Sequence, residues 1–313
     1  MRMRLRLFQD TGAYIERVFL RLTASLLRAC PRIPGRWRLI FWIQPRLKRA
    51  FDGRPFPACV RMGCGYKINV DLQDHVGRHI FTTGDYEPDN TKVFKSLLRP
   101  GDSVLDIGAN IGYFTLLSRS LVGYAGTVYS FEASSSIMAL LKKNIRLNEI
   151  TNIETYHNAV VERERMLTFY ESSEAHLGIS SIRAASAPNC KAYSIRGVSI
   201  DSLADRLKKI SLIKLDIEGA EYLALRGCDG LIRRDRPYIV MELTDGFLHE
   251  MGTSGSDILD FLRRRKYACY RNTWHGLEIL DGAPPDQCNI LAVPEEKEKD
   301  FRGRNCNVRT VLK

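Results

Sequence analysis

The stretch DSVLDIGANIGYFT, residues 102–115, decides the fold that we expect for this chain. Its first half is a run of apolar residues typical of a buried strand, and it stops at the carboxylate of Asp106. The chain then turns through Gly108 and Gly112 and returns to an apolar pattern with helical spacing. Ligands of open α/β sheets bind beyond the carboxyl ends of the strands, so this turn is a candidate ligand site where glycines admit close approach.

The segments that follow repeat this order of strand and then helix. The predicted strands are residues 102–107, 127–132, 153–157, 211–217 and 237–243. The predicted helices lie near residues 112–122, 134–148, 219–227 and 255–265. Such alternation predicts an α/β fold with a doubly wound, Rossmann-like parallel sheet that carries helices on both faces.

Further strands are expected on either side of this repeat. Residues 60–72 alternate in part, like one or two antiparallel strands, and residues 84–98 read as a turn that leads into a helix. Near the other end, the runs YACYR (267–271) and CNILAVP (288–294) flank a loop around Trp274. We expect these two runs to form a C-terminal antiparallel hairpin.

The charge of the chain is concentrated at its start. The formal net charge is +11, and residues 1–54 carry +10 of it, from twelve Arg and one Lys against three acids. The remaining 259 residues are therefore close to neutral. No apolar run reaches the roughly 20 residues of a spanning helix, and no secretion signal is evident. Eight cysteines without a CxxC pair are typical of reduced thiols, so we expect a cytoplasmic protein.

The basic leader also contains an apolar stripe at helical spacing. The stripe consists of Ile15, Val18, Phe19, Leu22, Leu26 and Ala29. Two interpretations stay open with about equal weight. The leader is either a helical layer packed on the domain, or a basic amphipathic segment on the inner face of an anionic membrane.

The residues around the glycine turn indicate which ligand it holds. Asn110 stands where a dinucleotide site, G-x-G-x-x-G, has its second glycine, which disfavours a pyrophosphate and hence NAD. The next strand ends in Glu132, which can accept both hydroxyls of an adenosine ribose, and Asn158 and Ala159 can face the adenine. These features describe S-adenosylmethionine, a nucleoside with an amino-acid tail and no phosphate. Taken singly, Asp106 reads as a turn residue and Glu132 as an acid at a helix start.

The motifs together resemble a known family. They are GDSVLDIGANIGYFTLLSRSLVG, VYSFEAS, LKKNIRLN, HNAVV, IKLDIEGAEYLALRGC, PYIVMEL and NILAVP, with TGDYEPDNTKVFKSLLRPGD as their lead-in. This set, from about residue 58 to 297, resembles the FkbM-type methyltransferases. The resemblance implies a class I S-adenosylmethionine-dependent fold that methylates hydroxyls of sugars or natural products. The candidate donor-binding residues are Glu87, Asp106, Gly108, Asn110, Gly112, Thr115, Glu132, Asn158 and Ala159.

Catalysis is expected from the segment IKLDIEGAEYLAL, residues 213–225. Methylation of a hydroxyl needs a base that removes its proton, and Asp216 at the end of the fourth strand is the leading candidate. Lys214 points to the same face of the sheet, so the two residues can stabilise each other's charged forms. Glu218 and Glu242 are the alternative bases, although Glu218 also reads as an acid at a helix start.

Metal sites are not expected. Asp216, Glu218 and Glu242 offer oxygen ligands suited to a divalent cation, but no metal-loop pattern accompanies them. A spacing close to that of a zinc finger is a second candidate, and we expect no zinc there because the segment alternates like a strand. Its residues are Cys59, Cys64, His75 and His79.

The sequence thus predicts an S-adenosylmethionine-dependent O-methyltransferase that acts on a saccharide, glycoconjugate or natural product. We expect a basic, partly helical extension (1–57), a methyltransferase domain (58–300) and a C-terminal tail (301–313). The alternatives are an RNA methyltransferase that uses the leader, and a non-catalytic membrane-associated scaffold. Nucleic acid is disfavoured as a partner. The Asn/Asp-Pro-Pro-Tyr/Phe run of methyltransferases that act on nitrogen is absent, which disfavours a nitrogen acceptor. The acceptor pocket is assigned to loops such as 171–190, which reveal neither the acceptor nor the oligomeric state.

Overall fold

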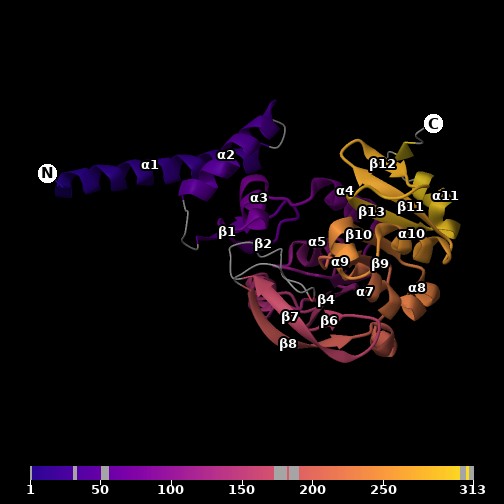
Figure 1. Cartoon of the computed structure of the whole chain (residues 1–313). Helices are drawn as coiled ribbons and strands as arrows, with labels where there is room; N and C mark the ends of the chain where they lie inside the picture. Colours follow the sequence, from indigo (N-terminus) through magenta and orange to yellow (C-terminus); the bar gives the residue numbers. More distant parts are fainter. Residues whose placement is uncertain are drawn as a thin grey trace. The chain divides into compact units, whose positions relative to one another are not determined.

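A computed structural model of the chain (Figure 1) describes residues 2–30, 34–50, 56–172, 182, 190–303 and 308–309. Of residues 2–15, 172, 308 and 309 it describes the backbone only. The chain divides into two compact units, Met1–Tyr86 and Glu87–Lys313. The predicted boundaries after residues 57 and 300 stay predictions. In the described part of the chain, no helix combines the length and apolar character needed to cross a bilayer.

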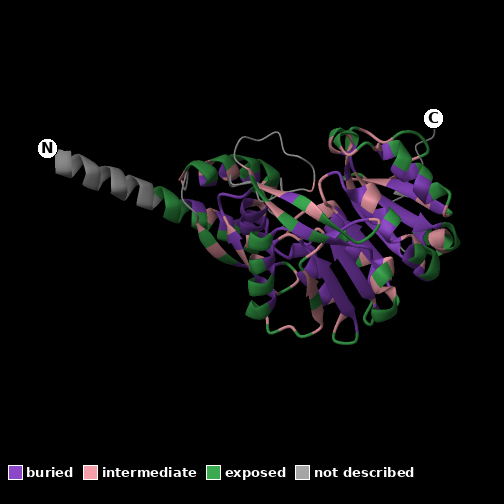
Figure 2. Cartoon of the chain, turned by 60° about the horizontal axis from the view of Figure 1, so that its bottom comes forward, coloured by how far each residue is buried: buried purple, intermediate pink, exposed green. Residues whose placement is uncertain are grey.

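The second unit is built on a nine-stranded sheet with the order β14-β12-β11-β13-β10-β9-β3-β4-β5. Its strands are β3 (Ser103–Ile107), β4 (Thr127–Phe131), β5 (Ile153–Tyr156), β9 (Leu212–Leu215), β10 (Tyr238–Thr244), β11 (Tyr267–Thr273), β12 (Gly276–Ile279), β13 (Gln287–Pro294) and β14 (Val308–Arg309). Strands β10, β9, β3, β4 and β5 are parallel to one another, which confirms the five predicted strands. All residues of β3, β4 and β9 and most of β10 are buried, whereas β5, at the edge of the sheet, is only partly buried (Figure 2).

The C-terminal strands differ from the predicted hairpin. Strand β11 pairs antiparallel with β13, as expected, but it also pairs antiparallel with β12 on its other side. Trp274 therefore lies in the turn from β11 to β12 and not in a loop to β13. The sequence analysis missed β12 because its four residues, GLEI, are too short to show a period.

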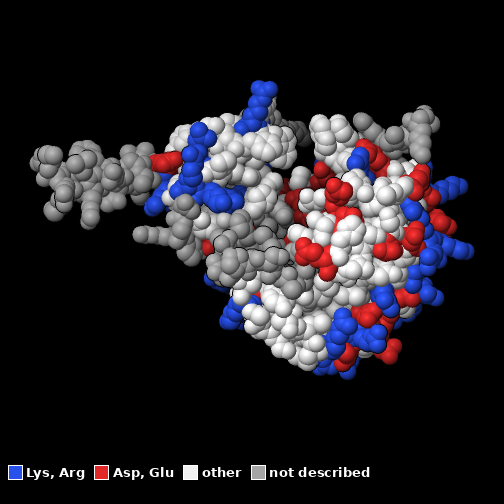
Figure 3. Space-filling model, in the orientation of Figure 1, with Lys and Arg blue, Asp and Glu red and all other residues white. Residues whose placement is uncertain are grey.

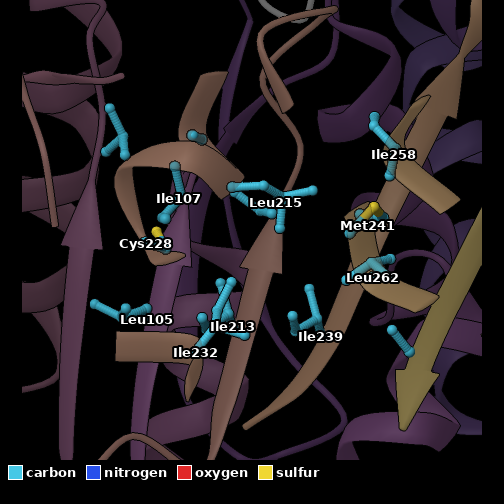
Figure 4. Close-up of a cluster of buried hydrophobic side chains, with 14 of the residues drawn as sticks. Leu105, Ile107, Ile213, Leu215, Cys228, Ile232, Ile239, Met241, Ile258 and Leu262 are labelled. Carbon is cyan, nitrogen blue, oxygen red and sulfur yellow. The ribbon is translucent and has the colours of Figure 1, made fainter. Parts of the chain in front are cut away.

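Helices cover both faces of this sheet, as predicted. They are α4 (Pro88–Leu97), α5 (Tyr113–Val122), α6 (Ser135–Leu147), α7 (Glu221–Gly227), α8 (Asp229–Asp235), α9 (Asp245–Glu250), α10 (Gly255–Arg263) and α11 (Glu295–Gly303), with a 3-10 helix at Asp201–Arg206. On one face Leu105, Ile107 and Leu215 pack with Cys228, Ile232 and Ile258 of the α7–α10 segment (Figure 4). Because side chains alternate along a strand, Asp106 and Lys214 belong to the opposite face, and α5 contacts β3 and β4.

A second sheet of this unit was not predicted. It has the order β6-β8-β7, with strands β6 (Ala159–Val160), β7 (Arg165–Ser172) and β8 (Cys190–Val198). The predicted acceptor loop, 171–190, begins at the end of β7 and ends at the start of β8. Apart from these ends and Ile182, it lies outside the described residues.

The first unit contains the leader. Its elements are α1 (Arg2–Ala29), α2 (Arg36–Ala50), β1 (Pro57–Arg61), β2 (Lys67–Asp71) and α3 (His75–Thr83). The antiparallel pair β1–β2 confirms the strands predicted over residues 60–72. Helices α1, α2 and α3 contact one another, and Asp74 caps α3 by accepting a hydrogen bond from the Gly77 amide.

Neighbouring protein atoms constrain both glycines of the turn after β3. Gly108 has a φ of +80°, and a Cβ built on it would lie 1.9 Å from the backbone oxygen of Asp216. Gly112 has a φ of +98°, and its Cβ would lie 2.7 Å from a methyl carbon of Leu141. Both glycines are therefore required by a left-handed backbone and by neighbouring protein atoms. The expectation that they also open space for a ligand stays a prediction, and the close approach at Gly108 joins the β3–α5 turn to the loop after β9.

We predict that Gly108→Ala destabilises the fold far more than Gly101→Ala. Gly101 also has a positive φ, +92°, but a Cβ at this residue would meet no atom within 4 Å, so Gly101 isolates the backbone strain. The strain alone costs about 1–2 kcal/mol, and the clash at Gly108 should add about 2 kcal/mol or more. Urea unfolding of the two variants measures the difference. Equal losses of unfolding free energy in the two variants would show that the backbone of Asp216 moves away from the added methyl group.

Candidate functional site

Asp106 lies at the carboxyl end of β3 and is fully buried. Its Oδ2 accepts a 2.5 Å hydrogen bond from Thr115, whose hydroxyl also lies 3.0 Å from that of Ser130. Its Oδ1 is buried and has no hydrogen-bond partner among the described residues. Burial raises the pKa of Asp106, and the charge of Lys214 opposes this shift. An unsatisfied buried carboxylate oxygen costs free energy, so Oδ1 can accept one more hydrogen bond, although Asp106 is 0% exposed and lines none of the described pockets.

Glu132 follows β4 and organises the loops on both sides of it. Its Oε2 accepts from the Asn110 amide at 2.9 Å, and its Oε1 accepts from the Ser134 amide at 2.7 Å. Burial raises the pKa of Glu132 to about 7, and these backbone amides oppose the shift. Ser134 is the N-cap of α6, so Glu132 also has the structural role of an acid at a helix start. With the amide of Ala133, three backbone groups donate to this carboxylate, so about one of its four acceptor sites is left for a ribose hydroxyl.

The other predicted donor residues mainly contact the protein itself. Asn110 has a φ of +50°, and its Oδ1 accepts from the Ile111 amide at 2.7 Å. The amide of Asn158 donates to the backbone oxygen of Arg196 at 3.1 Å, and Ala159 pairs within the second sheet. Thr115 is fully buried, so it orients Asp106. Direct donor contacts from these residues stay predictions.

Three carboxylates meet beyond the ends of β9 and β10. Glu87, Asp216 and Glu242 each have an oxygen within 4.8 Å of the others. We call them the carboxylate cluster. The sequence analysis considered Asp216, Glu218 and Glu242 as cation ligands without expecting a metal there, and the structure groups Glu87, not Glu218, with Asp216 and Glu242. Glu218, with a φ of +55°, instead lines the pocket beside the cluster with Asp216, Glu242, Phe247 and Gln287. Figure 3 shows acidic side chains over β10 and α9 on this face.

Glu87 was missed as a cluster member because it lies 129 residues before Asp216. It precedes α4 with a φ of +41°, and its side chain does not cap that helix. Its Oε2 accepts from the side-chain amide of Asn90 at 2.7 Å. Asn90 in turn bonds Asn289 at 2.9 Å and Asn272 at 2.8 Å, so three amides from α4, β13 and β11 fix the position of Glu87. The left-handed turn before α4 is the local feature that directs this side chain inward.

Lys214 is the cation of the site. Its Nζ lies 3.0 Å from Oδ2 of Asp216 and 3.5 Å from the Gly108 oxygen, so the predicted pair with Asp216 forms. Its ammonium also lies 5.1 Å from the ring centre of Phe114. Burial would lower the pKa of Lys214, but attraction by Asp216, Asp106 and Glu87 outweighs it and raises the pKa. Lys214 is therefore a fixed positive charge.

One cation does not balance the surrounding acids. Burial, followed by repulsion from Asp216, raises the pKa of Glu87 to about 7, and the same two causes raise the pKa of Glu242. Gln287 donates to Glu242 at 2.9 Å and partly offsets its shift. The cluster therefore retains a proton close to neutral pH, as coupled carboxylates do.

The cluster is also where an ion would bind most easily. Among the described residues, Glu87, Asp216 and Glu242 form the one group of His, Cys, Asp or Glu close enough to hold a metal. The cysteines and histidines with zinc-finger-like spacing form no such group in that part of the chain. Carboxylate oxygens suit Mg²⁺, but the ammonium of Lys214 already occupies one side of Asp216. The expectation of no metal stays a prediction.

Loss of the Glu87 carboxyl should make the stability depend less on pH. Its pKa is 4.5 in an unfolded chain and about 7 in the fold, so the folded state keeps a proton that the unfolded state releases. The free energy of unfolding should therefore fall as pH rises from about 5 to 7, and Glu87→Gln should make this fall shallower by up to about one proton. Urea unfolding across this range measures the slope. Glu295→Gln, at an exposed position, is the control, and equal slopes for Glu87→Gln and wild type would contradict the shift.

Comparison with known proteins identifies the family of the chain. The family model described as methyltransferase FkbM domain matches residues 106–269, more than half of the chain. Methyltransferase 1 of Beauveria bassiana is 28% identical over 215 residues, which cover 60% of this chain and 78% of that protein. AMB antimetabolite synthetase AmbE of Pseudomonas aeruginosa is 26% identical over 270 residues, which cover 72% of this chain and 12% of that protein.

The solved structure of an FkbM methyltransferase from Methylobacillus flagellatus KT also matches. The identity is 16% and the TM-score 0.40, over 69% of this chain and 52% of that one. The chain thus spans about half of that structure and a small part of AmbE. The extent of the family match settles the assignment: the chain belongs to the FkbM methyltransferase family, whose methyl donor is S-adenosylmethionine.

Proposed function

We propose that this chain is an O-methyltransferase that acts on a hydroxyl of a saccharide, glycoconjugate or natural product. The observation that carries the proposal is the carboxylate cluster. It combines a carboxylate held by a lysine with a neighbouring carboxyl whose pKa is about 7. A hydroxyl nucleophile needs a base of this kind, because its proton must leave as the new bond forms.

The surplus of acids also suits the donor. S-adenosylmethionine supplies a reactive methyl group on a sulfonium, and it carries a second positive charge on its ammonium. The unpaired Oδ1 of Asp106 would accept a hydrogen bond from the ammonium, and a ribose hydroxyl would donate to Glu132. The buried acids near Lys214 would favour a cation beside them. The residues present thus fit the donor that the family uses.

The residues of the cluster have separable tasks in methyl transfer. Asp216, held by Lys214, would accept the hydrogen bond of the acceptor hydroxyl and align its oxygen with the methyl group. The proton released by the hydroxyl would pass to a carboxylate of the cluster, since the pKa of Glu87 is raised to about 7 and that of Glu242 is also raised. Phe247 and Thr244 line the same pocket and would limit access of water to the acceptor side.

The charge of the leader indicates where the enzyme would act. Residues 1–54 carry nearly all of the net charge, so attachment to an anionic membrane surface is the partner that its charge favours. A lipid-linked glycan would remain in that membrane plane and so stay within reach of the enzyme. We therefore include peripheral attachment to the cytoplasmic leaflet in the proposed function. RNA is the second candidate, favoured by the same charge but by no basic surplus in residues 55–313.

Glu132 should be tested with paired ligands, because it also supports two loops. We predict that Glu132→Ala weakens binding of S-adenosylhomocysteine by about 1–3 kcal/mol in titration calorimetry, and that NAD does not bind wild type. The 2′-deoxy analogue separates the two roles. Wild type should bind the 2′-deoxy analogue more weakly than S-adenosylhomocysteine, whereas Glu132→Ala should bind both ligands with equal affinity. An equal loss of affinity for the analogue in both proteins would show that Glu132 supports loops and does not touch the ribose.

Asp216→Asn should separate chemistry from donor binding. We expect donor affinity within several-fold of wild type and turnover lower by about 10²-fold or more, because the amide cannot accept the proton or hold Lys214 by charge. Glu242→Gln and Glu87→Gln are the matched variants, and a shifted pH profile in one of them would identify the carboxyl that retains the proton. The acceptor is found first, with labelled donor and cell extract divided into lipid, saccharide, RNA and protein fractions. Turnover near wild type in Asp216→Asn would rule out its assigned role.

A further inference from the structure

Helix α1 carries two separate apolar stripes. Leu20, Ala24 and Leu27 recur at helical spacing and are buried where α1 contacts α2 and α3. A second stripe lies on another side of the helix and remains exposed. It consists of Val18, Phe19, Leu22 and Leu26, with exposed fractions of 36–65%. This exposed stripe is the one that the sequence singled out, so packing within the unit does not account for it.

Helix α2 repeats the arrangement. Its buried residues are Ile40, Ile43 and Leu47, whereas Trp37, Phe41 and Trp42 are exposed, Phe41 to 76%. The ring of Phe19 meets the ring of Trp42 edge to face, with 6.4 Å between their centres. This contact joins the exposed side chains of both helices into one surface. We call it the leader patch, and it comprises Phe19, Leu22, Leu26, Trp37, Phe41 and Trp42.

Basic side chains border the leader patch. Arg38 precedes Trp42 by one turn of α2, and Lys48 and Arg49 follow Phe41 and Trp42 by two turns, all three exposed. The guanidinium of Arg46 lies 3.9 Å from the ring centre of Trp42. Across residues 16–30 and 34–50 there are eight Lys and Arg against one acid, Glu16. Figure 3 shows these basic side chains over α1 and α2, with uncharged surface between them.

The apolar side chains and the basic border together discriminate among three possible partners of the leader patch. A nucleic acid would use the arginines, but it would leave Leu22 and Leu26 without a partner. A second copy of the chain would cover the apolar side chains, but it would bring two strongly basic surfaces together. A bilayer with anionic lipids buries the apolar residues and also attracts the basic border. Aromatic rings and long basic side chains are typical of the bilayer interface.

We infer that the leader patch inserts into the acyl-chain boundary of an anionic membrane, with α1 and α2 lying in the plane of the interface. This inference rests on the membrane location in the proposed function and not on the proposed chemistry. It adds the residues that enter the lipid and the requirement for apolar burial as well as charge. Over its described residues, neither helix is long and apolar enough to cross the bilayer.

The three tryptophans of the chain allow a direct test. Two of them, Trp37 and Trp42, are in the leader patch, and the third, Trp274, is exposed in the second unit. Trp274→Phe in the full chain therefore leaves fluorescence from the patch alone. Vesicles of phosphatidylcholine and phosphatidylglycerol with brominated acyl chains should quench this fluorescence, and vesicles of phosphatidylcholine alone should quench it far less.

Sedimentation with the same vesicles tests the apolar contribution. Replacing Leu22 and Phe41 together by Ser should weaken binding by at least about tenfold, as expected for two apolar side chains that leave the lipid. Tyr124→Ser, at a 91% exposed position of the second unit, is the matched control and should bind like wild type. Both variants should keep wild-type affinity for S-adenosylhomocysteine, which shows that they are folded and keeps the result independent of the donor site.

The outcomes separate the possible failures. If wild type does not sediment with anionic vesicles, both the membrane location and this inference are wrong. If it binds without quenching, and the double variant binds equally, the membrane location stands and insertion is wrong. If RNA displaces the protein from vesicles, or if wild type dimerises and the double variant does not, the patch serves that other partner and the inference is overturned.

Discussion

The ion pair between Lys214 and Asp216 is the interaction on which the site depends. The ammonium of Lys214 is buried, pairs with Asp216 and contacts the backbone oxygen of Gly108. A buried charge without a partner costs several kcal/mol, so Lys214 and the surrounding acids require one another. Because Gly108 packs directly on the Asp216 backbone, this contact also holds the proposed donor turn beside the proposed base. Geometry and charge thus join two loops that the sequence places more than 100 residues apart.

From this pairing the arrangement of the remaining acids follows. Asp106, Glu87 and Glu242 exceed what one lysine can neutralise, and burial raises the pKa of all three, that of Glu87 to about 7. Such a site favours a ligand that brings positive charge and a reaction that releases a proton. Methyl transfer from a sulfonium to a hydroxyl meets both conditions. The network of Asn90, Asn272 and Asn289 holds Glu87 in this arrangement by neutral hydrogen bonds, which leave the charge balance unchanged.

The sequence predicted those parts of the molecule that depend on local pattern. Buried parallel strands are continuous apolar runs, so β3 and β9 were found together with Asp106 and Asp216 at their ends. Glu87 was not placed in the cluster, because only tertiary packing brings the start of α4 to β9 and β10. The packing contact at Gly108 was not predicted for the same reason, since the atom that excludes a Cβ belongs to a distant loop. In the leader, periodicity identified an apolar stripe but could not show that another stripe makes the packing contacts.

A crystal structure of the complex with S-adenosylhomocysteine tests the central claim most directly. The claim is that the donor's reactive centre and the base meet at the Lys214–Asp216 pair. The account predicts that the amino group of the ligand bonds Oδ1 of Asp106 at about 3 Å, with the sulfur facing the carboxylate cluster. A ligand bound elsewhere, or bound with its sulfur directed away from Asp216 and with Oδ1 of Asp106 still unpaired, would contradict it.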